Sequence, residues 1–224
     1  MFYNGDGRHV HCAVNLDASA GNSHASIDTG LDRAAERGEV VELYAHHPGE
    51  TVAVADLEYV LAGARARGLP FVTYADFAAG AGTGPGLALS FDDTWVVEWA
   101  ELLPLFEQYG ARATFFVSRY AHLGDERHRL LHVLADAGND IEAHTVDHYR
   151  APEYVEDHGL DDYIDNEVLP SIQVLRDAGF PVAAFAYPFG ARTSELDDAI
   201  LKHVPILRSV AFSHGAPVAS PCPE

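Results

Sequence analysis

Lysine is almost absent from this chain of 224 residues, and long hydrophobic runs are absent altogether. Lys202 is the one lysine, and 34 acidic residues against 14 basic ones give a net charge of -20. A surface this acidic repels nucleic acids and anionic membranes, so we expect neither as a partner. No run of about 18 apolar residues occurs, so we expect no membrane span. Dense counterions would screen such a surface, which predicts a halophilic source; the alternative is an arginine-rich composition without salt adaptation.

Cysteine is also scarce, with Cys12 and Cys222 near opposite ends of the chain. Two cysteines make neither a disulfide framework nor a zinc knuckle, so we expect free thiols; the alternative is one bridge joining the two ends. Residues 1–7 contain no basic patch and no apolar stretch. They do not read as a signal peptide, which favours a cytoplasmic location.

Strand-like and helix-like segments alternate from residue 38 onward, in a chain that is 48% hydrophobic. That length and composition suit one domain with one core. The expected strands are residues 40–45, 71–74, 87–91, 113–117, 141–143, 182–186 and 206–212. The expected helices are residues 54–67, 96–109 with a kink at Pro104, 126–137, 161–178 and 195–203. This alternation favours an α/β fold with a parallel sheet, either a barrel or a doubly wound sheet.

Two groups of polar residues follow apolar strands. Asp92 and Asp93 come directly after residues 87–91, and His144 and His148 come after residues 141–143. A spacing of four residues brings two imidazoles to one face of a helical turn, within reach of one ion. With Asp93 they form a set of two histidines and one carboxylate that leaves positions open for water and substrate. Taken alone, the aspartates also suit a solvated turn or a helix N-cap.

Four segments carry a resemblance to the polysaccharide deacetylase family (NodB-like, carbohydrate esterase family 4). In chain order they are residues 89–94 with Phe-Asp-Asp, 111–117, 144–148 with His-Thr-Val-Asp-His, and 185–190 with Tyr-Pro-Phe-Gly. The resemblance implies a distorted, seven-stranded (β/α) barrel. It also implies a metal-dependent hydrolase that removes N-acetyl or O-acetyl groups from a glycan. Such enzymes often work outside the cell, which conflicts with the missing signal peptide.

The resemblance assigns a role to each motif residue. Asp93, His144 and His148 would bind a divalent metal, Zn²⁺ first, with Co²⁺, Ni²⁺ or Mn²⁺ as alternatives. Asp92 would be the catalytic base and His46 the catalytic acid, with His47 as the fallback for the acid. The backbone N–H of Tyr187 would help to hold the oxyanion. The expected substrate-binding residues are Tyr187, Pro188, Phe189 and Trp95.

The order of the motifs resembles a circular permutation. Residues 42–46 and the helix and strand after them, up to residue 73, resemble the family's last strand, histidine and closing helix, yet they precede the first motif. Within the single domain of residues 1–224, residues 1–78 would match the family's C-terminal part and residues 87–224 its N-terminal part. Residues 79–86 would be a glycine-rich connector. The alternative is a chance similarity of one βα unit.

One expected residue is missing from the third motif. The family often has an arginine there that supports the base, but this chain has Ala186. Arg192 is a weak substitute, and Asp17 is a candidate for the family's later, arginine-bound aspartate. This departure keeps a hydrolase of a small amide or cyclic imide open as an alternative. A non-catalytic carbohydrate-binding relative is a further alternative, and the sequence carries no signal for an oligomeric state.

Overall fold

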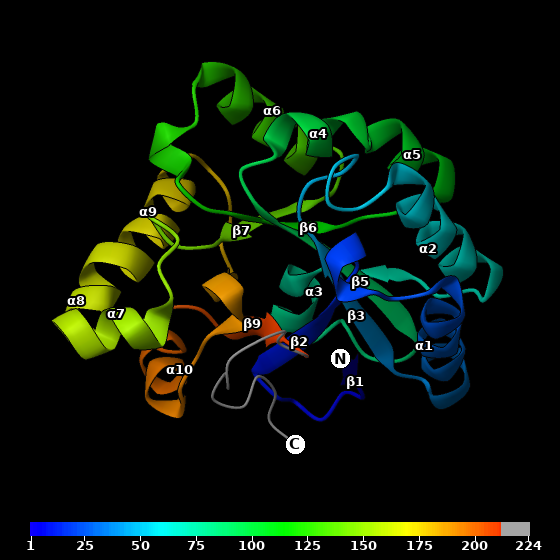
Figure 1. Cartoon of the computed structure of the whole chain (residues 1–224), viewed down its shortest axis with the longest axis horizontal. Helices are drawn as coiled ribbons and strands as arrows, with labels where there is room; N and C mark the ends of the chain where they lie inside the picture. The colour runs from blue at the N-terminus through cyan, green and yellow to red at the C-terminus, as the bar shows by residue number, and fades with distance from the viewer. Residues whose placement is uncertain (212–224) are drawn as a thin grey trace.

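The computed structural model describes residues 1–211, and its strands form a sheet that closes into a barrel (Figure 1). Seven parallel strands run round the ring in the order β3-β2-β9-β8-β7-β6-β5, and β5 pairs again with β3. The seven strands are β2 (Val10–Asn15), β3 (Val40–Ala45), β5 (Gly86–Asp93), β6 (Thr114–Val117), β7 (Asp140–Ala143), β8 (Ala184–Ala186) and β9 (Ile206–Val210). The predicted seven-stranded (β/α) barrel is confirmed.

Helices surround this ring (Figure 1). They are α1 (His24–Arg37), α2 (Val54–Ala66), α4 (Val96–Glu101), α5 (Leu103–Tyr109), α6 (Asp125–Asp136), α7 (Ala151–His158), α8 (Leu160–Tyr163), the π-helical segment η3 (Ile164–Val168), α9 (Leu169–Asp177) and α10 (Ser194–Ile200). The helix predicted at residues 96–109 is divided beside Pro104, as expected from its missing N–H. The long helix predicted at residues 161–178 is likewise interrupted, by η3 just before Pro170. Within residues 1–211 no helix has the length and apolar character to cross a bilayer.

Short elements close the amino-terminal end of the barrel. They are β1 (Phe2–Tyr3), β4 (Phe71–Val72) and α3 (Tyr74–Ala78), and three 3₁₀ turns lie elsewhere, at η1 (Ala18–Ala20), η2 (Tyr120–His122) and η4 (Pro188–Gly190). Tyr74 and Phe77 of α3 pack with inward-facing residues of β8 and β9. The sequence predicted strand up to Tyr74, but Thr73 and Asp76 form a capping box that starts α3 instead.

The alternation of side chains along β5 explains how an aspartate enters the barrel. Leu89 and Phe91 face the helices and belong to the large outer core. Ala88 faces the barrel interior, and Asp92 shares that face because side chains alternate with a period of two. Both faces are buried, as expected for a parallel strand covered by helices.

The cysteine prediction is wrong where the structure tests it. Cys12, on β2, is disulfide-bonded and buried rather than a free thiol. Cys222 lies outside the described residues.

Candidate metal centre and active site

Asp93, His144 and His148 converge at the carboxyl-terminal end of the barrel. One ligand atom from each residue lies within 4.8 Å of the others. The Asp93 Oδ1 atom is 3.1 Å from His148 Nε2 and 3.7 Å from His144 Nε2. Asp93 ends β5 with a φ of 87°, which departs from the strand conformation. The three predicted ligands therefore form one cluster of metal-binding character.

The environment of His144 suits a neutral ligand. Its Nδ1 atom lies 2.9 Å from the carbonyl oxygen of Ala186, so Nδ1–H donates there and the Nε2 lone pair faces Asp93. Burial is the main cause that lowers the pKa of His144 to about 4. Near pH 7 the imidazole is therefore uncharged and available to a cation.

Asp93 supplies the negative charge of the cluster. Burial alone would raise the pKa of this carboxyl group. The hydrogen bond with His148 and the electrostatic influence of the two histidines outweigh burial and hold the pKa of Asp93 well below its usual value. An anionic oxygen between two imidazole nitrogens fits a divalent cation such as Zn²⁺.

The two histidines meet through an irregular loop, not the predicted helical turn. Residues 144–150 contain no helix, and Thr145 and His148 have φ values of 68° and 67°. The buried Thr145 hydroxyl accepts a hydrogen bond from His148 N at 3.0 Å. Glu167, which is 2% exposed, accepts one from Asp147 N at 2.9 Å. These bonds hold a left-handed backbone that is costly for non-glycine residues, as is common at functional sites.

A buried arginine supports Asp92. The Arg208 guanidinium donates from Nη2 to Asp92 Oδ1, and the side chains of Arg208 and Asp92 are 1% and 4% exposed. Arg208 lies on β9 directly beside Ala186 in the register with β8. The neighbouring strand therefore supplies the arginine that the third motif lacks. The suggestion that Arg192 fills this role is wrong, because Arg192 pairs with Asp197.

His46 and Asp17 form a second polar pair at the same end of the barrel. His46 Nδ1 bonds to Asp17 Oδ2, while Asp17 Oδ1 accepts from His46 N at 3.2 Å and from the Thr51 hydroxyl at 2.7 Å. Burial would lower the pKa of His46, but the bond to Asp17 and the nearby carboxylates raise it. The expectation that Asp17 partners the arginine is wrong, since its partner is His46.

His47 has a different environment. Its ring stacks on Trp95 with centroids 3.8 Å apart, and its Nε2 lies 3.8 Å from Glu98 Oε1. Trp95 is half-buried and uses one ring face for this contact. His46 has a carboxylate within hydrogen-bond distance, whereas the carboxylate nearest His47 is 3.8 Å away, so His46 suits a proton donor better. Trp95 keeps only part of its surface for a ligand.

The third motif only partly matches its predicted binding role. Tyr187 is 0% exposed, donates its hydroxyl to Asp197, and donates its backbone N–H to Arg208 O at 3.0 Å. Pro188 is buried as well. Neither side chain is exposed and the Tyr187 N–H already has a partner, so the substrate-binding roles of Tyr187 and Pro188 and the oxyanion role of the Tyr187 N–H stay predictions. Phe189 is 53% exposed beside the His148 ring, with centroids 4.8 Å apart, and stays a candidate.

Comparison with known proteins gives a family match and several structural likenesses. The family model described as polysaccharide deacetylase matches residues 79–204. A polysaccharide deacetylase from Bacillus cereus has a TM-score of 0.63 at 16% identity, covering 81% of this chain and 61% of that chain. A de-N-acetylase from Aggregatibacter actinomycetemcomitans has a TM-score of 0.62 at 16% identity, covering 81% and 91%. At this identity the likenesses support the barrel fold alone.

A family 4 carbohydrate esterase from Streptomyces lividans, solved in complex with acetate, is 25% identical with a TM-score of 0.42. That match covers 54% of this chain and 59% of the esterase. The chain thus spans about three-fifths of the length of this esterase and of the Bacillus cereus protein. No curated protein matches the sequence.

Proposed function

Because the chain belongs to the polysaccharide deacetylase family, we propose that it hydrolyses the N-acetyl groups of a glycan and leaves a free amine. The observation that carries this proposal is the cluster of Asp93, His144 and His148 beside a separate, arginine-bound Asp92. The reaction breaks a non-peptide C–N bond and releases acetate. O-acetyl groups are an alternative target for the same residues.

Asp93, His144 and His148 would hold a divalent metal, with Zn²⁺ first and Co²⁺, Ni²⁺ or Mn²⁺ as alternatives. The fit rests on one anionic oxygen and two imidazole nitrogens whose ligand atoms lie within 4.8 Å of one another. When bound, the ion supplies Lewis acidity that activates water and polarises the acetyl carbonyl. The Nδ1 bond from His144 to Ala186 O keeps the ligand nitrogen aimed at Asp93.

Asp92 and His46 would move the protons. The Arg208 guanidinium donates a hydrogen bond to the Oδ1 atom of the buried Asp92. Asp92 is thereby positioned to accept the proton of the attacking water. The bond to Asp17 favours the protonated form of His46, which then donates its proton to the departing amine nitrogen.

The two rival functions lose support. The small-amide hydrolase was favoured by the missing arginine at Ala186, but Arg208 on the neighbouring strand gives Asp92 an arginine partner. A non-catalytic sugar-binding role would not require Asp92, Asp93, His144 and His148 to be held together with their supporting bonds. Glycan hydrolysis is therefore the proposal that uses all of these contacts.

Two substitutions separate metal binding from proton transfer. Asp93→Ala should lose both the metal, measured by mass spectrometry after dialysis, and acetate release from N-acetylated oligosaccharides. Asp92→Asn should retain the metal, while its kcat falls by about 100-fold to 10,000-fold through loss of the base.

The matched control is Asp136→Asn at the exposed end of α6, which changes the same type of charge away from the site. It should behave as the parent protein in both assays. Full activity of Asp92→Asn would exclude Asp92 as the base. Retention of metal by Asp93→Ala would exclude the ligand set.

A further inference from the structure

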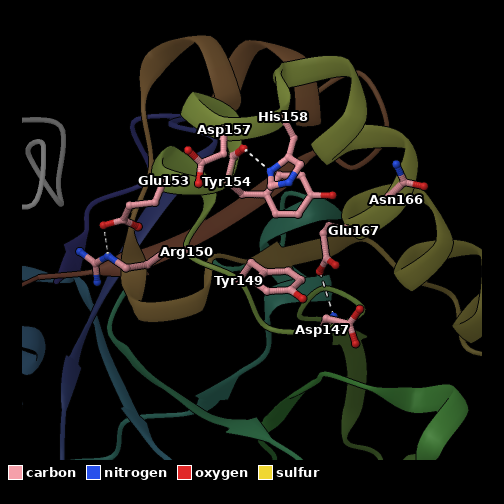
Figure 2. A pocket seen from close by; sticks show the side chains of 9 residues that line it. All are labelled: Asp147, Tyr149, Arg150, Glu153, Tyr154, Asp157, His158, Asn166 and Glu167. Carbon is pink, nitrogen blue, oxygen red and sulfur yellow. Dashed lines mark hydrogen bonds and ion pairs between the residues drawn. The ribbon is translucent and has the colours of Figure 1, made fainter.

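A groove of about 770 Å³ lies next to the proposed metal ligand His148, bounded by the loop after β7 and by α7 and η3 (Figure 2). Tyr149 and Arg150 follow His148 in sequence and line this groove. Arg150 also lies over the ring of Phe189, 5.5 Å from its centroid, and that ring contacts His148. Arg150 therefore links the groove, through Phe189, to the proposed metal ligand His148. No step described so far uses the groove.

An aromatic surface forms part of the groove. Among residues 1–211 only three large hydrophobic side chains are exposed. One of them, Tyr149, lines the groove, and a second, Phe189, lies under Arg150 at its edge. Tyr149 is 49% exposed and its ring packs on Tyr154 with centroids 5.3 Å apart. The Tyr154 hydroxyl is fixed by a 2.7 Å bond to Asp162. An exposed ring on a fixed support suits contact with a ligand that has an apolar face and polar edges, such as a pyranose.

Negatively charged groups outnumber positively charged ones in the groove. Four carboxylates line it, and Arg150 is the one guanidinium; the carboxylates belong to Asp147, Glu153, Asp157 and Glu167. The Arg150 charge is already used, because its Nε atom lies 2.8 Å from Glu153 Oε1. Within the described part of the chain, Asp147 and Asp157 have no ion pair. The groove thus favours a cation beside an aromatic ring and disfavours a carboxylate-bearing sugar.

We propose that this groove is a subsite for a neighbouring glycan unit whose amino group is already free and protonated. The inference rests on the proposed function and extends it to substrate choice. Deacetylation converts a neutral acetamide into an ammonium group, so the product of one turnover is the unit that the groove recognises. The enzyme would then act faster on partly deacetylated glycan than on fully acetylated glycan.

The test compares tetrasaccharides of N-acetylglucosamine that are fully acetylated with those that carry one free amine on either side of the reacting unit. The parent protein should show a higher kcat/KM for one of the two amine-containing isomers, by about threefold or more, as one exposed ion pair allows. This preference should shrink in high salt, because screening weakens exposed charge pairs. Equal kcat/KM values for all three substrates would overturn the subsite.

Two variants test whether the groove causes the preference for amine-containing substrates. Asp157→Asn should reduce the ratio of kcat/KM values between the two substrate types, while Asp136→Asn should leave that ratio unchanged. Tyr149→Ala should raise KM for both types because it removes the shared aromatic surface. An Asp157→Asn variant with the parent ratio would refute the assignment of the ammonium to this groove. Acetate release without preference rejects the subsite alone, whereas no acetate release from any tetrasaccharide rejects the proposed function as well.

Discussion

Replacing Arg208 by methionine would test how the barrel holds Asp92 ready to accept a proton. The Arg208 and Asp92 side chains are 1% and 4% exposed, so water has little access to replace the lost partner. Removing one member of a buried ion pair costs about 3–5 kcal/mol, since the remaining charge is left uncompensated. Methionine keeps much of the side-chain volume, so the cavity adds little to this cost. We expect the free energy of unfolding to fall by about 3–5 kcal/mol near pH 8.

The loss should depend on pH in a defined direction. A buried, unpaired carboxylate binds its proton more tightly than a carboxylate of the unfolded chain does. Above about pH 4 this carboxylate would therefore bind more protons in the folded variant than in its unfolded chain, so the loss of stability relative to the parent grows as pH rises. Urea unfolding at pH 5 and pH 8 should show the smaller deficit at pH 5. The acidic limb of the kcat/KM profile should move to higher pH for the same reason.

A matched control is Arg192→Met, which breaks a similarly buried pair with Asp197 but leaves Asp92 untouched. That variant should lose stability while the acidic limb stays in place. If Arg208→Met kept the parent profile and the parent stability at pH 8, Arg208 would have no part in holding the base. If both variants moved the acidic limb equally, the shift would reflect general loosening of the barrel.

Two further substitutions test other contacts of the site. Asp17→Asn should lower the pKa of His46, move the alkaline limb of the kcat profile to lower pH and reduce kcat by about tenfold or more. An alkaline limb at the same pH as in the parent would exclude a role for the Asp17–His46 bond in proton donation. The bond with Asp17 raises the pKa of His46 in the folded state. The stability that this bond contributes is therefore present below about pH 6.5 and lost above the folded pKa. Thermal unfolding of Asp17→Asn should show a larger loss of stability relative to the parent at pH 6 than at pH 9. Gly190→Ala should cost about 2–4 kcal/mol in urea unfolding, because its φ is 66° and a Cβ would lie 2.4 Å from Val210 Cγ2. Gly21→Ala, with a φ of 69° and no atom within 4 Å, should cost only about 1 kcal/mol, and equal losses for the two would contradict the packing argument.

Periodicity and residue chemistry predicted much of the barrel and the ligand cluster. The strand at Gly86–Asp93 is a continuous apolar segment ending in two carboxylates, so its burial and the exit of the aspartates at the barrel end follow from the pattern. The loop from His144 to His148 did not follow, because its left-handed residues are held by tertiary bonds such as the one from Asp147 N to Glu167. Spacing alone favoured a helical turn that the structure does not contain.

Arg208 was missed although the sequence contained a signal. It is the one charged residue in the segment Ile206–Val210, where a buried charge needs a partner. The choice of Asp92 as that partner depends on the alignment of β9 with β8 and on the closure of the ring, which no local pattern encodes. The short helix α3 was missed for a different reason, because the expected strand at residues 71–74 included Thr73, which instead forms a capping box with Asp76.

The position of the first 78 residues in the ring supports the proposed circular permutation. The family model matches residues 79–204 and leaves out β2 and β3, yet these two strands complete the barrel between β9 and β5. The parallel pairing of β2 with β9 places Val10 beside Leu207, although they lie near opposite ends of the chain. We therefore propose that a link from β9 to β2 in the unpermuted order is replaced here by residues 79–86, between α3 and β5. In this arrangement Asp17 and His46 reach a site whose other residues all follow them in sequence, because neighbouring strands in a closed ring need not be consecutive in the chain.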